Sequence, residues 1–111
     1  MPDATEFLAG FGFTTGAQFD GYILRHASAT HETIKRYREY YYAITLEFMN
    51  TGSGTYDNLY QAVHAKISQQ PIIYGIRNPY RCIIDSPQYG DIMQTPDGVI
   101  TWQLTGHSYR V

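Results

Sequence analysis

Residues 37–49 alternate in character with a period of two, and this alternation constrains the fold more than any other feature of the sequence. Side chains on a β-strand point to opposite faces in turn, so large apolar groups gather on one face and a mixed, wettable set on the other. The apolar positions are Tyr40, Tyr42, Ile44, Leu46 and Phe48. In a helix the same residues would form no continuous apolar stripe. The sequence therefore predicts a long strand in a sheet that is covered on one side only.

The composition is that of one folded domain without a strong electrostatic signature. The chain has 111 residues, of which 43% are hydrophobic and 15% aromatic, so its apolar surface is sufficient for a core of its own. The net charge is -2, and no basic stripe of the kind that binds nucleic acid is present. No apolar run has the length of a membrane span or the character of a secretory leader. We expect a protein made in the cytoplasm that neither binds nucleic acid sequence-specifically nor contacts a membrane.

Residue types that often carry chemistry are present but do not form a recognisable site. A single cysteine, Cys82, excludes an internal disulfide and a multi-cysteine zinc site, and its apolar neighbours predict a buried thiol. Four histidines lie scattered without the spacing of metal ligands: His26, His31, His64 and His107. We therefore expect no catalytic residue, no metal and no cofactor, and interpret the chain as non-enzymatic.

Residues 1–21 combine four glycines with four phenylalanines. Such a glycine density disfavours helices and strand interiors, whereas four phenyl rings are too many for a free tail. We expect an extended N-terminal arm over residues 1–21, followed by a single domain over residues 22–111. Two destinations for the rings remain open: the core of their own domain, or a neighbouring copy of the chain. The rings are those of Phe7, Phe11, Phe13 and Phe19.

A hairpin is expected to precede the helical part of the chain. Residues 22–29 predict a strand with Tyr22, Leu24 and His26 on one face, and residues 28–31 are turn-prone. An antiparallel pair with the long strand is the economical interpretation.

Residues 56–69 predict an amphipathic helix that Thr55 caps and Pro71 ends. The remaining elements are short strands at 72–76 and 80–85, a turn at 95–98 and a final strand at 99–111, in which Gly106 marks a bend or a close approach of another backbone. The predicted fold class is α+β: an antiparallel or mixed sheet with one helix across one face. One helix covers only part of such a sheet, so the arm or another subunit must cover the rest.

The element order over residues 38–111 resembles that of the tail terminator and tail-completion proteins of tailed bacteriophages. The matching elements are a charged, aromatic strand, a loop, the amphipathic helix with Leu59-Tyr60-Gln61-Ala62-Val63, short strands after Pro71, the acidic turn Asp97-Gly98 and a closing strand. Members of that family usually open with a helix, and the glycine-rich start of this chain departs from their pattern. The resemblance implies a ring-forming virion subunit that contacts its own copies and tail tube or head–tail connector proteins.

Self-association through the arm and the sheet is thus the leading hypothesis for function. Its predicted contact residues are Phe7, Phe11, Phe13, Phe19, Tyr37, Tyr41 and Tyr109. One alternative is a small dimeric ligand-binding domain with an apolar pocket near Tyr42, Ile44, Tyr60 and Trp102. A further alternative is a phosphoryl-transfer enzyme, because Arg25-His26 at a strand end resembles the motif of histidine phosphatases, with His107 as a second histidine.

Overall fold

A seven-stranded sheet and two helices make up the part of the chain that the computed structural model describes, namely residues 3–34, 39–74, 79–85, 93–94 and 98–111. The elements are α1 (Ala4–Gly10), β1 (Gln18–Phe19), β2 (Tyr22–Ile34), β3 (Glu39–Asn50), α2 (Tyr56–Ile67), β4 (Ile72–Tyr74), β5 (Pro79–Ile84), β6 (Met93–Gln94) and β7 (Val99–Arg110). The fold class is α+β, as predicted. The predicted turn at 95–98 falls largely on residues 95–97, which lie outside the described residues.

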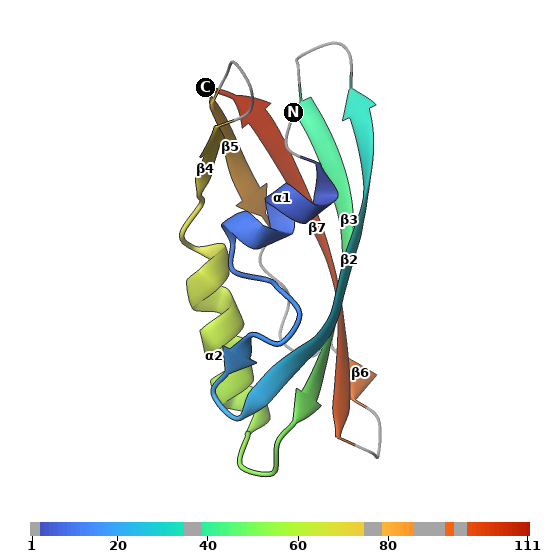
Figure 1. The fold of residues 1–111 in the computed structure, drawn as a ribbon, viewed down its shortest axis with the longest axis vertical. Coiled ribbons are helices and arrows are strands. Elements are labelled where there is room, and N and C mark those ends of the chain that lie inside the picture. The colour runs from blue at the N-terminus through green and yellow to red at the C-terminus, as the bar shows by residue number, and fades with distance from the viewer. Residues whose placement is uncertain (1–2, 35–38, 75–78, 86–92, 95–97) are drawn as a thin grey trace.

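Every strand pair in the sheet is antiparallel, which settles the choice between an antiparallel and a mixed sheet for the described strands. The strand order is β1-β2-β3-β7-β5-β4, and β6 pairs with β7. The long strands β2, β3 and β7 lie side by side and are twisted, and Figure 1 shows α1 and α2 together on one side of the sheet. The sheet therefore has an inner face beneath the helices and an outer face that no described element covers.

The predicted alternation along β3 is confirmed, since its even-numbered residues from 42 to 48 are all buried. The even-numbered residues of β7 from 100 to 108 are buried beside them, as the final strand was predicted to arrange Ile100, Trp102 and Leu104. Helix α2 packs Leu59, Val63 and Ile67 onto this face. Its predicted cap is also confirmed, because the amide of Asn58 donates to Thr55 Oγ1 at 3.4 Å.

The predictions of a single helix and of an extended arm are wrong for residues 4–10, which form α1. The cause is a capping box: the amide of Glu6 donates to Asp3 Oδ1 at 2.8 Å, and the Glu6 carboxylate accepts from the amide of Asp3 at 3.5 Å. Glycine enters only at the end of the helix, where Gly12 takes a φ of 84°. The glycines of this segment therefore end a helix and do not prevent one.

The predicted turn at residues 28–31 is also wrong, because β2 continues to Ile34. The predicted side-chain faces hold for Tyr22 and Leu24 and then reverse, since Arg25 is an extra residue in a β-bulge between Leu24 and His26. Beyond the bulge His26 is exposed, whereas Ala27 and Ala29 pack against the core. Alanines suit this position because α1 lies over β2.

Of the two roles that the sequence left open for Gly106, a bend or a close approach of another backbone, the structure shows the close approach. A Cβ atom at Gly106 would lie 2.9 Å from the carbonyl oxygen of Ile83 and 2.8 Å from Cζ of Phe7. The Phe7 ring instead uses this space and stacks on Tyr42, the cross-strand partner of Gly106, with ring centroids 3.9 Å apart. The Tyr42 hydroxyl and Ser108 Oγ are hydrogen-bonded at 3.1 Å beneath the ring. The stacked pair of Phe7 and Tyr42, beside Gly106, thus packs helix α1 against the sheet.

Candidate functional site: the outer face of the sheet

The outer face consists of the side chains of β2, β3 and β7 that point away from α1 and α2. It comprises Ile23, His26, Ser28 and Thr30 from β2, Tyr41, Ala43, Thr45, Glu47 and Met49 from β3, and Thr101, Gln103, Thr105, His107 and Tyr109 from β7. Most of these residues are polar or small. Because one face of an antiparallel sheet can remain in contact with water, such a face is stable without a cover and also available to a partner.

One end of the outer face is aromatic. Tyr41 lies opposite His107 across the β3–β7 pair, with ring centroids 6.0 Å apart, and the ring of His107 stacks on that of Tyr109 at 6.3 Å. Tyr41 is 42% exposed. Its hydroxyl donates to Glu39 Oε2 at 3.1 Å, and this hydrogen bond, followed by the Glu39 charge, raises the pKa of Tyr41. Tyr41 therefore stays a neutral hydrogen-bonding group at physiological pH.

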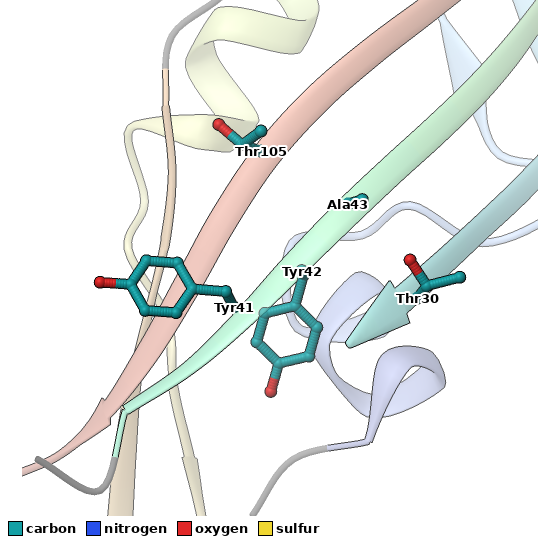
Figure 2. Close-up of a pocket in the computed structure, with 5 residues that line it drawn as sticks. All are labelled: Thr30, Tyr41, Tyr42, Ala43 and Thr105. Carbon is teal, nitrogen blue, oxygen red and sulfur yellow. The ribbon is translucent and has the colours of Figure 1, made fainter. Parts of the chain in front are cut away.

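The middle of the outer face is hollowed because its side chains are short. Thr30, Ala43 and Thr105 lie side by side across β2, β3 and β7, as Figure 2 shows. They line a depression of about 260 Å³ bounded by Tyr41, and a second depression of about 330 Å³ continues past Ala43 and Thr105 toward Gln103. A partner's side chains could enter here without displacing any part of the fold.

The opposite end of the outer face carries an ion pair and an apolar groove. Arg25, the extra residue of the bulge, forms an ion pair with Glu47 on β3. Beyond this pair, Ile23 lies opposite Met49, and both line a groove of about 510 Å³. Met49 is 44% exposed, so an apolar contact point is available at this end.

The predicted contact residues divide between the two faces of the sheet. The four phenylalanines are between 0% and 3% exposed and lie in the core of their own chain, where Phe19 also packs edge-on against Phe48. Of the two destinations left open by the sequence, these rings occupy the first. Tyr41 and Tyr109 lie on the outer face and are joined there through His107. Tyr37 lies outside the described residues.

The arrangement needed for phosphoryl transfer by two histidines is absent from the described part of the sheet. His26 lies opposite Glu47, and Glu47 lies opposite Thr101, six residues along β7 from His107. Six residues of strand span about 20 Å, too far for both imidazoles to reach one phosphate. Nor do three or more potential metal ligands converge anywhere among the residues the structure describes.

The pocket expected between sheet and helix is occupied by core side chains. Tyr42, Ile44 and Trp102 are each no more than 2% exposed. The Trp102 ring packs edge-on against Phe48 at 5.7 Å and meets Tyr60 from α2 at 6.2 Å. The side chains named for this pocket therefore pack on one another and on the core.

His107 is the residue of the outer face that sequence reasoning missed as a partner of Tyr41. The alternation along the final strand places His107 on the same face as Thr105, but only the β3–β7 register shows that it meets Tyr41.

Within the described residues, neither helix is long and apolar enough to cross a bilayer. Comparisons with protein-family models, curated proteins and solved structures find nothing that matches the chain.

Proposed function

We propose that this chain is a non-enzymatic assembly protein that associates with its own copies and with other proteins through the outer face of its sheet. The observation that carries the proposal is the one-sided cover of the sheet: both helices and all four phenylalanines of residues 1–21 lie on the inner face. The outer face retains an exposed tyrosine, two adjoining depressions and an exposed methionine. Tyrosine and methionine are enriched in protein–protein interfaces, which supports this role for the surface.

The resemblance to phage tail terminator and tail-completion proteins supports a more specific form of the proposal. The order of long strand, helix, short strands and closing strand is present in β3, α2, β4, β5 and β7. Members of that family usually open with a helix, and the short helix α1 supports the proposal on this point. On this basis the chain is a virion subunit at the end of a phage tail, in contact with tail tube or connector proteins.

In a ring of such subunits the contacts are head-to-tail, so two different surfaces of one copy meet. The aromatic and the apolar ends of the outer face lie at opposite ends of β3, and the molecule is 44 Å long. Each copy could therefore use Tyr41 toward one neighbour and Met49 toward another.

The test is sedimentation equilibrium of the parent and of two charge variants at concentrations up to about 50 µM. Ala43→Lys places a cation in the middle of the outer face, and Gln61→Lys places the same charge on the exposed side of α2. Burying an unpaired charge in an interface weakens association at least about tenfold, so only Ala43→Lys should dissociate the assembly.

A second measurement separates assembly from folding. Both substitutions lie at exposed positions, so the thermal midpoints of both variants should stay near that of the parent. Equal association of Ala43→Lys, Gln61→Lys and the parent would reject the outer face as the interface. A parent chain that stays monomeric up to about 50 µM would reject self-association itself.

A further inference from the structure

The long edge of the sheet along β2 carries backbone hydrogen-bonding groups that no described segment binds. Its first part is paired: the amide of Leu24 donates to the carbonyl of Ala17 at 2.9 Å, and the carbonyl of Leu24 accepts from Gly16 at 2.8 Å. From Arg25 to Ile34, no described segment pairs with β2 on the side away from β3. In Figure 1 the upper part of β2 forms the right-hand margin of the molecule.

The hydrogen bonds around β3 show which residues of β2 point their backbone toward this edge. The amide of Asn50 donates to the carbonyl of Gly98, on the β7 side of β3. Every second residue of a strand directs its amide and carbonyl to the same neighbouring strand, so Ile44 and Leu46 also direct theirs to β7. Their cross-strand partners in β2 are Ala29 and Ala27. Since β3 does not bind the amides and carbonyls of these two alanines, they point outward from the sheet.

The other edge of the sheet is a poor match for this one. Strand β4 has three residues and follows Pro71, which has no amide hydrogen. The carbonyl of Pro71 already accepts from Cys82, and that of Gln70 accepts from Arg81 Nη1 at 3.2 Å. A second copy that offered β4 to β2 could satisfy only a small part of the free edge.

Strand β2 itself is the segment of this chain that matches the free edge in length. The side chains along the edge from Ala27 to Thr30 are all short and uncharged, so two such edges can approach without steric or electrostatic conflict. Proline and lysine, which protect many natural edge strands, do not occur in residues 25–34, where the charged residues are Arg25 and Glu32. The bulge at Arg25 lies at the start of the edge and leaves the rest regular.

We propose that the β2 edge binds the β2 edge of a second copy, antiparallel and about a two-fold axis near Ala29, so that the two sheets join into one. About this axis, residues 27–31 pair with the same five residues of the second copy in reverse order, which forms about six backbone hydrogen bonds. The outer faces of the two copies then become one continuous surface. This inference rests on the proposed self-association and adds a two-fold contact at the edge, distinct from the head-to-tail contacts proposed for the outer face.

The test uses proline to remove one outward amide. Ala29→Pro deletes an edge donor but keeps the ladder between β2 and β3, and an edge position of this kind tolerates proline. Ala29→Ser is the matched control, since it changes the same residue and keeps the amide. We expect the dimer dissociation constant from sedimentation equilibrium to rise at least about tenfold for Ala29→Pro and to change less than about twofold for Ala29→Ser.

A second variant and a second readout make the test independent of how well the proline variant folds. Ser28→Lys with Thr30→Lys leaves the backbone intact and brings like charges together across the two-fold axis, so it should also weaken the dimer about tenfold. In the parent, hydrogen exchange of the Ala27 and Ala29 amides should slow as protein concentration rises, because dimerisation protects them.

Concentration-independent exchange of both amides, or a double-lysine variant that dimerises as well as the parent, would overturn the inference. The outcome is distinct from that for the proposed function, because Ala43 lies in the middle of the outer face and not on the edge. If Ala43→Lys abolishes self-association and Ala29→Pro leaves it unchanged, the outer face stands as the interface and the β2 edge is excluded.

Discussion

Substituting Phe7 by alanine tests whether the N-terminal segment belongs to the fold of its own chain. The Phe7 ring is completely buried, lies 5.3 Å from the ring of Phe11 and stacks on Tyr42 at 3.9 Å with an angle of 18° between the planes. It also fills the space above Gly106. Since no side chain from the sheet can occupy that space, the cavity left by the truncation cannot close easily.

The expected cost follows from burial and from the lost aromatic contact. Truncating a fully buried phenylalanine costs about 3–5 kcal/mol, and a stacked aromatic pair adds to the lost burial energy. Domains are stable by about 5–15 kcal/mol in total, so Phe7→Ala should remove a large part of the stability. At about 4 °C per kcal/mol for a chain of this length, the thermal midpoint should fall by about 12–20 °C.

Urea unfolding at a concentration where the chain is monomeric measures this effect without any contribution from association. Tyr41→Ala is a suitable control, because it removes an aromatic ring of similar size from an exposed position and should change the unfolding free energy by less than about 1 kcal/mol. If residues 1–21 instead bound a neighbouring copy, Phe7→Ala would leave the monomer's midpoint unchanged and weaken only the assembly. That result would refute the assignment of α1 to the core.

Two further predictions concern the sheet beneath α1. Gly106→Ala should destabilise the chain by about 1–3 kcal/mol in the same urea assay, because the new methyl group meets the Phe7 ring and the rigid carbonyl of Ile83; an unchanged midpoint would contradict the close packing. Burial raises the pKa of the Cys82 thiol from 9.0 to about 12. As the pH rises, the thiol of the unfolded chain therefore loses its proton before that of the folded chain. The stability that the buried thiol contributes is complete below pH 9 and is lost as the pH rises toward 12. Cys82→Val should therefore lose less stability than the parent between pH 9 and 11, and equal alkaline slopes would argue against a buried thiol.

Patterns that repeat along a single segment predicted the local structure well. The alternation along residues 37–49 identified β3 and its buried face, and the apolar spacing after Thr55 identified α2. In both segments the same periodicity continues over three or more repeats, so one unusual residue cannot reverse the interpretation.

Features that depend on one residue or on a distant partner were not predictable. The extra residue Arg25 reverses the two faces of β2, and no period in the sequence marks that insertion. Helix α1 was hidden because its glycines outweighed the short capping box of Asp3 and Glu6. On the outer face, Tyr41 and His107 are 66 positions apart, so their contact follows from the register of β3 and β7 and from nothing local.

The location of the phenylalanines determines what kind of association this chain can make. Because the four phenylalanine rings of residues 1–21 lie in the core, a partner meets an outer face that is mostly polar, with the Arg25–Glu47 ion pair and an apolar contact at Ile23 and Met49. Such a surface supplies less hydrophobic driving force than a core-like interface, so a single contact through it should be weak and reversible. Backbone pairing at the β2 edge adds directional hydrogen bonds without exposing apolar area in the monomer. Under the proposed function, stable assembly then requires several such contacts at once.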